Sequence, residues 1–227
     1  MENIKRAEKI RFFQGTLLAW FEKNGRSFPW RAKSATNYVR IISEVLLQRT
    51  KAETVARYLP IFLQKYPSWR QLGEASEADL ISIMTPLGLG NQRGKRLYKL
   101  AQELKRRNGI FPRERHLVEE ISMMGQYITN AYELFILKKP APLLDVNMAR
   151  VLERFFGYRN LADIRYDPYL QDLSKAVVAH SEAITVNWAV LDFAALICKS
   201  KTPLCENCPL TKKCLYFNLL INPLDEP

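Results

Sequence analysis

No cysteine precedes Cys198 in this chain of 227 residues, and only four cysteines are present in all. Histidine is nearly as scarce, with two residues, and glycine is limited to nine. Low glycine together with 48% hydrophobic residues excludes a disordered chain and indicates a folded globule. Because all the thiols lie in one short stretch, with no secretory signal, we expect a metal site in a reducing compartment rather than disulfide bonds.

Long apolar runs are also missing. No segment approaches the roughly 20 consecutive apolar residues that a membrane-spanning helix needs. The first residues, Met1-Glu2-Asn3-Ile4-Lys5-Arg6, do not form the apolar stretch of a signal peptide. We therefore expect a soluble intracellular protein with no membrane partner.

The sequence has no convincing pair of alternating strands and no internal repeat. Helical periodicity dominates instead, and it predicts an all-α fold with short loops. Gly88, Gly90 and Gly94 are expected in a loop. The expected helices are residues 10–24, 38–50, 51–66, 77–84, 95–107, 117–123, 127–137, 146–156, 174–185 and 187–198.

Acidic residues are outnumbered, with 34 lysines and arginines against 23 aspartates and glutamates. The formal net charge of +11 favours a polyanionic partner, and nucleic acid is the commonest one. Charge alone leaves a basic protein without such a partner as the alternative. The length suits one large domain or two small ones, with an ample core.

The four cysteines have the spacing C-x6-C-x2-C-x5-C. They are Cys198, Cys205, Cys208 and Cys214. Thiolates are soft metal ligands, and four of them on one loop form a closed site for zinc or for an iron–sulfur cluster. Zinc ribbons usually present two C-x2-C knuckles, whereas this stretch contains one. The cysteine residues alone leave the metal open.

Five segments identify a family. They are Phe28-Pro29-Trp30-Arg31, Ser43 to Thr50, residues 121–127, Asp145-Val146-Asn147 followed by Arg150, and the cysteine stretch. In these segments the chain resembles the helix-hairpin-helix base-excision DNA glycosylases that carry a [4Fe–4S] cluster. That superfamily includes endonuclease III, the adenine-DNA glycosylases and the archaeal thymine–guanine mismatch glycosylases, and the chain is most similar to the last group.

The resemblance implies a domain organisation and a cofactor. It predicts two helical lobes with a DNA cleft between them: a helix-hairpin-helix six-helix domain over residues 30–138, and a cluster domain formed by residues 1–29 and 139–227. The cysteine spacing matches the cluster loop of the family, so a [4Fe–4S] cluster is favoured over zinc. In the family the cluster is not the hydrolytic catalyst, and its expected role is to fix a basic loop.

The resemblance also implies three catalytic residues. Asp145 aligns with the catalytic aspartate, whose carboxylate stabilises the positive charge that develops on deoxyribose and orients the attacking water. Glu44 matches a glutamate that faces the base pocket. Tyr127 stands where the bifunctional lyases carry their Schiff-base lysine, and because a phenol cannot form an imine, no lyase activity is expected. Taken alone, Asp145 would be an ordinary helix N-cap, and the two roles are compatible.

The hairpin departs from the family pattern. Its second glycine is Gly125, but Ser122 and Met123 replace the usual proline and first glycine. We expect Met123 to crowd a bound phosphate or to change the turn, because glycine permits left-handed conformations and close backbone approach.

Further DNA contacts are implied by the same resemblance. Gln48 and Arg49 match residues that fill the gap left by an extruded base or contact the opposite guanine. The run from Asn91 to Arg93 matches a loop that lines the DNA. The full set of expected DNA contacts is Gln48, Arg49, Asn91, Gln92, Arg93, Met123, Gly125, Gln126 and Asn147.

Sequence details favour thymine or uracil over adenine as the excised base. Adenine enzymes typically carry Gly-Tyr-Tyr and Asp-Gly-Asn where this chain has Leu89-Gly90-Asn91 and Asp145-Val146-Asn147. The chain also ends soon after Cys214, with no room for an additional domain that recognises 8-oxoguanine.

We therefore expect a monofunctional glycosylase that hydrolyses the N-glycosidic bond of thymine or uracil mispaired with guanine. Two alternatives remain: an adenine-DNA glycosylase acting opposite guanine or 8-oxoguanine, and a catalytically altered protein that binds mispairs or unusual bases. The expected partner is double-stranded DNA with a mispaired or damaged base. The protein is expected to be a monomer located with the genomic DNA, in the cytoplasm or nucleoid of a prokaryote.

Overall fold

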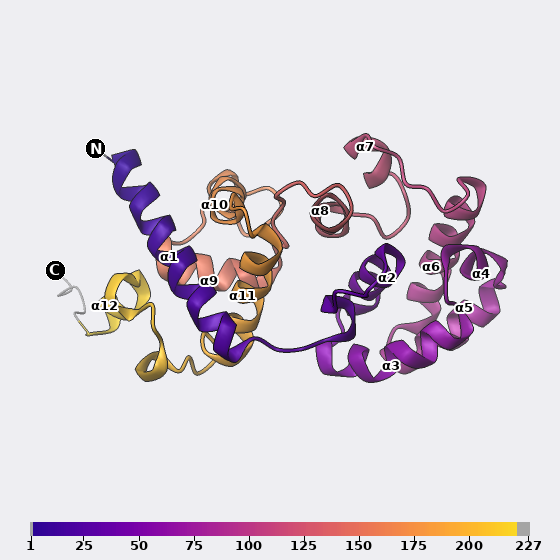
Figure 1. The fold of residues 1–227 in the computed structure, drawn as a ribbon, viewed down its shortest axis with the longest axis horizontal. Coiled ribbons are helices and arrows are strands. Elements are labelled where there is room, and N and C mark those ends of the chain that lie inside the picture. The colour runs from indigo at the N-terminus through magenta and orange to yellow at the C-terminus, as the bar shows by residue number, and fades with distance from the viewer. Residues whose placement is uncertain (1, 222–227) are drawn as a thin grey trace. The chain divides into compact units, whose positions relative to one another are not determined.

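The computed structural model describes residues 2–221, which fold into two compact units (Figure 1). Unit 1 joins the N-terminal stretch up to Arg26 to the stretch from Leu137 onward, and unit 2 is Ser27–Ile136. The described residues contain helices and no strand, so the expected all-α class is confirmed. None of these helices is long and apolar enough to cross a membrane.

Unit 2 is built from short helices around α6, Gly90–Arg106. Helices α4 and α5 both pack against α6, and α2 packs against α8. The remaining connections include two 3₁₀ turns. The bounds are η1 Pro29–Arg31, α2 Asn37–Leu47, α3 Ala52–Lys65, α4 Trp69–Glu74, α5 Glu77–Met84, η2 Thr85–Leu87, α7 Arg115–Glu119 and α8 Gln126–Phe135.

Unit 1 forms a helical core from segments far apart in the sequence. Helix α1 packs against α11, and α9 lies against α10, α11 and α12. Phe13, Leu17, Phe155, Val177 and Phe193 are among its fully buried side chains. The bounds are α1 Glu2–Asn24, α9 Val146–Phe156, α10 Pro168–Val178, α11 Ala183–Leu196, η3 Cys205–Asn207, η4 Thr211–Lys213 and α12 Leu215–Ile221.

Helix α10 differs from the sequence expectation of residues 174–185 at both ends. The helix begins at Pro168 because Asp167 caps it: the Asp167 carboxylate accepts a hydrogen bond from Leu170 N at 2.7 Å. Proline at the first helical position reinforces this start, since it has no N–H to leave unsatisfied. The Asp-Pro pair was the signal that the periodicity argument missed.

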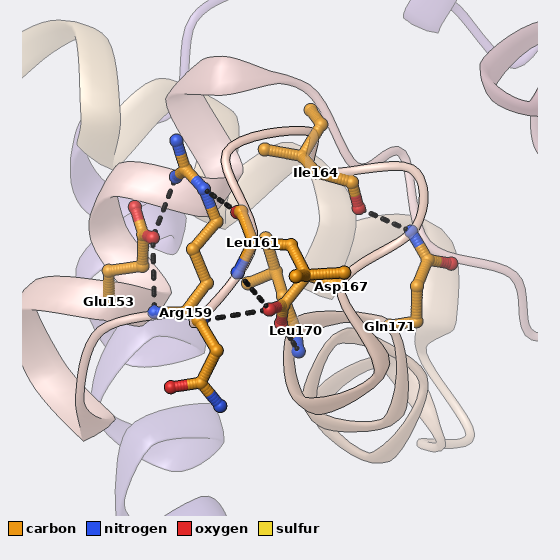
Figure 2. Close-up of polar contacts among 8 residues, drawn as sticks. Glu153, Arg159, Leu161, Ile164, Asp167, Leu170 and Gln171 are labelled. Atoms are coloured by element: carbon orange, nitrogen blue, oxygen red, sulfur yellow. Dashed lines mark hydrogen bonds and ion pairs between the residues drawn. The ribbon is translucent and has the colours of Figure 1, made fainter.

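The same carboxylate organises the loop before α10 (Figure 2). Its second oxygen accepts hydrogen bonds from Asn160 N and Leu161 N, both at 2.8 Å. Burial alone would raise the pKa of Asp167, but these main-chain N–H groups together with that of Leu170 hold the pKa below its usual value. Arg159, which donates to Glu153 at 2.7 Å, fixes the other end of the loop.

Other helix ends differ as well, and the largest of these differences is at α1, which begins at Glu2 rather than at residue 10. Helix α2 ends at Leu47 rather than at residue 50, α7 covers Arg115–Glu119 rather than 117–123, and α11 begins at Ala183 rather than at residue 187. The short helices α4 and α12 were not expected at all, since one or two turns give too few apolar repeats to detect.

Gly90 and Gly94 lie inside α6 and not in a loop as expected. Glycine is a poor helix former, so its presence there needs a packing reason. A Cβ atom at Gly94 would lie 2.4 Å from Ile81 Cα and 2.6 Å from Ile81 N. Gly94 therefore allows α5 to approach α6 backbone to backbone.

We predict that Gly94→Ala lowers the free energy of unfolding even though alanine favours helices. The higher helix propensity of alanine stabilises the protein by about 1 kcal/mol. The added methyl group, however, overpacks the contact between α5 and α6, which costs more, up to about 3 kcal/mol. Urea unfolding followed by circular dichroism measures the difference. The matched control is Gly15→Ala in α1, where an added Cβ meets nothing within 4 Å and should stabilise by about 0.5–1 kcal/mol. Equal stability of Gly94→Ala and the wild type would contradict the close contact.

Candidate functional site

Two of the three expected catalytic residues meet in unit 2. Glu44 lies on α2 with a side chain only 3% exposed, and Tyr127 is the second residue of α8. The Tyr127 hydroxyl donates a hydrogen bond to Glu44 Oε2 at 3.1 Å. A buried carboxyl group needs such a partner, because burial without hydrogen bonds is costly. The packing of α2 on α8 therefore produces a carboxyl–phenol pair.

Asp145 stands at the start of α9 in unit 1, where it is the N-cap residue. Its Oδ1 accepts hydrogen bonds from Asn147 N at 2.9 Å and Met148 N at 2.8 Å. Its Oδ2 accepts from the Asn147 side chain at 2.6 Å. Three donors and the positive end of the helix dipole thus hold one half-buried carboxylate in a fixed orientation.

A polar chain connects this carboxylate with the first cysteine. Asn147 Oδ1 accepts a hydrogen bond from Arg150 at 3.1 Å. Arg150 also donates to the carbonyl oxygens of Cys198 at 2.9 Å and Ala194 at 3.0 Å. The Asn147 side chain bonds to these partners within unit 1, and its expected contact with DNA stays a prediction. Asn147 therefore orients Asp145 through contacts within unit 1.

Asn187 is a residue that sequence reasoning missed. It is fully buried on α11, where its side-chain oxygen accepts from Leu143 N at 2.6 Å. Its nitrogen donates to the carbonyl oxygens of Ala141 at 3.2 Å and Ala183 at 2.8 Å. The Asn187 amide therefore binds the segment that contains Ala141 and Leu143, just before Asp145, to α11. The available signal was an asparagine inside a mostly apolar helix.

All four cysteines line one pocket in unit 1. They are free thiols, and burial raises the pKa of Cys205, of Cys214 and, to about 11, of Cys208. Metal binding requires thiolates, so a cation would have to compensate this desolvation. Within residues 2–221 no group of three or more His, Cys, Asp or Glu side chains is arranged to hold a metal ion.

The surroundings of the pocket suit a negatively charged sulfur ligand set. Val151, Phe155 and Phe193 give it apolar walls. Arg154 donates to Cys198 Sγ at 3.5 Å and to the Lys199 carbonyl oxygen at 2.7 Å. A guanidinium that donates to a sulfur atom offsets part of its charge when it is ionised. The donor chemistry therefore fits a thiolate-held metal group, although the arrangement does not identify which one.

The hairpin turn adopts the left-handed conformation that glycine usually supplies. Met123 has φ of +69° and is only 2% exposed, so its side chain lies in the core of unit 2. The expected crowding of a phosphate stays a prediction. The Met123 carbonyl oxygen accepts from Gln48 Nε2 at 3.3 Å. Gly125 is the N-cap of α8 and has an extended backbone that any residue can adopt. Gln126, half-buried, is the first residue of that helix.

The turn after α2 and the start of α6 present exposed side chains. Arg49, Asn91 and Gln92 are exposed, and Gln48 is half-buried. Leu89, which sequence reasoning did not assign to DNA, is 54% exposed and has φ of +54° as the N-cap of α6. The signal for Leu89 in the sequence was a large apolar residue between two glycines. The structure adds that this turn is strained.

Arg93 was expected to contact DNA, but the structure places it in the interior of unit 2. Its side chain is buried, and its guanidinium donates to the carbonyl oxygens of Leu46 at 2.8 Å and Leu87 at 3.0 Å. Periodicity explains why: Arg93 falls on the same face of α6 as Leu97 and Leu100, which are fully buried. The residue therefore belongs to the interior of unit 2.

The sequence and the fold of this chain were compared with those of known proteins. The sequence is similar to a thymine-DNA glycosylase of Aeropyrum pernix, with 32% identity over 92% of this chain and 96% of the relative. It is 33% identical to a thymine/uracil-DNA glycosylase of Pyrobaculum aerophilum over 90% of this chain and 91% of the relative. An adenine DNA glycosylase of Buchnera aphidicola is 31% identical over 89% of this chain but only 58% of its own length.

A solved structure described as a thermostable thymine-DNA glycosylase superposes with a TM-score of 0.85. It covers 93% of this chain and 97% of its own, at 30% identity. The pattern of the HhH-GPD superfamily of base excision DNA repair proteins matches residues 42–177, and the chain belongs to this superfamily.

We predict that Met123→Gly destabilises unit 2 although it restores the glycine of the family. Relief of the left-handed conformation gains about 1–2 kcal/mol, whereas loss of a buried methionine side chain costs about 2–5 kcal/mol. Thermal unfolding should therefore show a lower Tm. Gly125→Ala is the control and should be nearly neutral, because nothing lies within 4 Å of an added Cβ. A more stable Met123→Gly protein would show that strain, not burial, dominates at this turn.

Proposed function

We propose that the protein is a monofunctional DNA glycosylase that hydrolyses the N-glycosidic bond of thymine or uracil mispaired with guanine. One observation carries the proposal: Asp145 is held by three hydrogen-bond donors at the start of α9. A fixed carboxylate is what this reaction needs, since no reorganisation is then required when charge develops. The names of relatives that match the chain over nearly their whole length support the choice of pyrimidine.

Cleavage of the N-glycosidic bond leaves positive charge on the deoxyribose ring. In the proposed mechanism the Asp145 carboxylate lies near C1′, where it stabilises this charge and orients the attacking water. Its three donors bind it from the helix side and keep both oxygen atoms in place. Asn147 supports this orientation by accepting a hydrogen bond from Arg150, and Arg150 in turn donates to the Ala194 carbonyl oxygen near the end of α11.

Glu44 and Tyr127 would bind the extruded base. Their hydrogen bond fixes the carboxyl group and the phenol relative to each other, so that polar atoms of known orientation meet the pyrimidine edge. Extrusion costs a few kcal/mol and is cheapest at a mispair, which contributes to selectivity. Because Tyr127 offers no amine, the sugar forms no imine with it, and the DNA strand stays intact after base removal.

The DNA partner would meet unit 2 at the turns that follow α2 and precede α6. Gln48 and Arg49 are placed to occupy the gap left by the base, and exposed Leu89 is suited to wedge between bases. Asn91 and Gln92 stand beside Leu89 at the N-terminus of α6. The N-terminal N–H groups of α8, from Gly125 and Gln126 onward, would bind a phosphate.

The cofactor proposed for the cysteine pocket is a [4Fe–4S] cluster. Cys198, Cys205, Cys208 and Cys214 would hold it, and when bound it would supply structural bonds rather than hydrolytic chemistry. The loop that it fixes carries exposed lysines, including Lys199 and Lys213, which suit contact with phosphates. We further propose that the protein acts as a monomer inside the cell, with genomic DNA.

Adenine removal is the second candidate function. The buried Glu44 favours it, because a buried carboxyl group is suited to protonate a purine and make it a better leaving group. The adenine DNA glycosylase relative supports it as well, although the chain matches only part of that protein.

A panel of duplexes separates these functions. The wild-type protein is incubated with T·G, U·G, A·G and A·8-oxoguanine duplexes, and strand cleavage is read on gels with and without alkali. We expect cleavage of T·G and U·G after alkali only. Cleavage confined to adenine duplexes would favour the second candidate, and binding without cleavage would indicate a catalytically altered protein. Strand nicking without alkali would contradict the role given to Tyr127.

The catalytic role of Asp145 is tested by Asp145→Asn. Asparagine can still cap α9 but carries no charge, so base release should fall by at least about 10²–10³-fold. DNA affinity, measured by gel shift, should remain close to that of the wild type. Unchanged base release by this variant would remove Asp145 from the mechanism.

A further inference from the structure

Arg93 carries a buried positive charge that the proposed mechanism does not use. One side of its guanidinium reaches the C-terminus of α2, where NH2 donates to the carbonyl oxygens of Leu46 at 2.8 Å and Val45 at 3.4 Å. The last carbonyl groups of a helix have no partner within the helix and lie at the negative end of its dipole. Arg93 satisfies these groups and so fixes the point at which α2 ends.

The same guanidinium also holds two turns. Its NH1 donates to Thr50 Oγ1 at 2.9 Å in the turn after α2. NH1 also lies 3.0 Å from the Leu87 carbonyl oxygen and 3.5 Å from that of Gly88, in the turn before α6. Thr50 Oγ1 itself lies 3.3 Å from the Leu87 oxygen, so the two turns are connected a second time.

Each of the two turns contains a residue in a conformation that only outside support maintains. Arg49 has φ of +57° and Leu89 has φ of +54°, and neither is glycine. Both side chains are exposed. A left-handed conformation is unfavourable for residues other than glycine, so it persists only where surrounding contacts stabilise it. The hydrogen bonds from Arg93 on the buried side of the two turns supply such contacts.

The hydrogen bonds of Arg93 within unit 2 leave its guanidinium unable to bind a DNA phosphate. Its terminal nitrogen atoms donate to carbonyl and hydroxyl oxygen atoms, and no carboxylate among the described residues pairs with it. Burial lowers the pKa of its guanidinium from the ordinary arginine value, and an arginine side chain stays protonated in proteins. A planar fork with several donors suits this geometry, whereas a lysine ammonium could reach only part of it.

We propose that Arg93 is a positioning residue that clamps the Gln48–Thr50 turn to the Leu87–Leu89 turn. The clamp sets the spacing of the side chains that enter the duplex, so that Gln48 and Leu89 engage a mispair together. This inference rests on the proposed function, because it assigns these turns to mispair recognition.

The experiment measures binding and not turnover. Dissociation constants are determined for a matched duplex and for a duplex in which 2′-fluorothymidine, which resists hydrolysis, faces guanine. Each is measured over a series of salt concentrations for the wild type, Arg93→Met and Arg93→Lys. We expect both variants to lose about tenfold in preference for the mispair, with Arg93→Lys the milder. Affinity for the matched duplex and its salt dependence should not change.

An arginine that contacts phosphate gives the opposite pattern. Its removal would weaken binding to both duplexes alike and lower the salt slope by about one. That result would overturn the proposal. Arg106→Met, which removes an exposed charge from the same helix, is the matched control and should leave the preference unchanged.

Two further variants keep the test valid if the Arg93 variants fold poorly. Thr50→Val removes one acceptor of the clamp and should reduce the preference in the same direction, by less. In a background with Gln48→Ala and Leu89→Ala, Arg93→Met should have no additional effect on preference, because the side chains that it positions are gone. An undiminished additional loss there would contradict a positioning role.

Failure of this inference and of the proposed function can be told apart. Base release by the wild type from an ordinary T·G duplex is measured alongside. Selective binding without base release would refute the glycosylase function and leave the clamp supported if the variants behave as expected. A wild type that does not prefer the mispaired duplex would overturn the clamp, whatever its activity.

Discussion

Hydrogen bonds that satisfy the ends of helices determine where the functional groups of this protein lie. Each helix leaves main-chain donors at its start and acceptors at its end without partners. Asp145 satisfies donors at the start of α9, and Arg93 satisfies acceptors at the end of α2. The caps are short, buried or half-buried contacts, so each capping side chain is fixed as firmly as the helix itself.

This constraint explains why polar groups are tolerated next to the cores of both units. A carboxylate or guanidinium is costly to bury without hydrogen bonds. Asp145 has three donors, and Asn187 secures the chain just before it. Glu44 receives a hydrogen bond from Tyr127. The residues proposed for chemistry are therefore held in orientation before any substrate binds, which is the condition for electrostatic stabilisation of a transition state.

Helix starts could be predicted from the sequence where the capping residue lies within a few residues of the helix. The start of α9 at Asp145 and the capping of α5 by Ser76 follow from short-range hydrogen-bond chemistry, and the structure has both. The start of α10 was also readable from Asp167 and Pro168, but the periodicity argument did not use this pair. Gly94 could not be placed correctly, because its reason is the backbone of α5, which is distant in sequence.

Tertiary partners account for the rest of the differences. The sequence marks Arg93 as a charge beside Asn91 and Gln92, and only packing shows that it faces inward. The burial of Met123 depends on neighbours that no short sequence pattern specifies. Asn187 was missed because a single amide in an apolar helix gives no sign of the segment that it binds.

Asp145 caps α9 and is proposed to stabilise the reacting sugar, and the substitution Asp145→Ser separates these two roles. Serine caps a helix about as well as aspartate but brings no charge. The decisive measurement is the single-turnover rate of thymine release from a T·G duplex, with Tm recorded on the same sample. We expect a Tm within about 3 °C of the wild type and a rate at least about 10²-fold lower. A variant that keeps the wild-type rate would contradict the proposed role of Asp145.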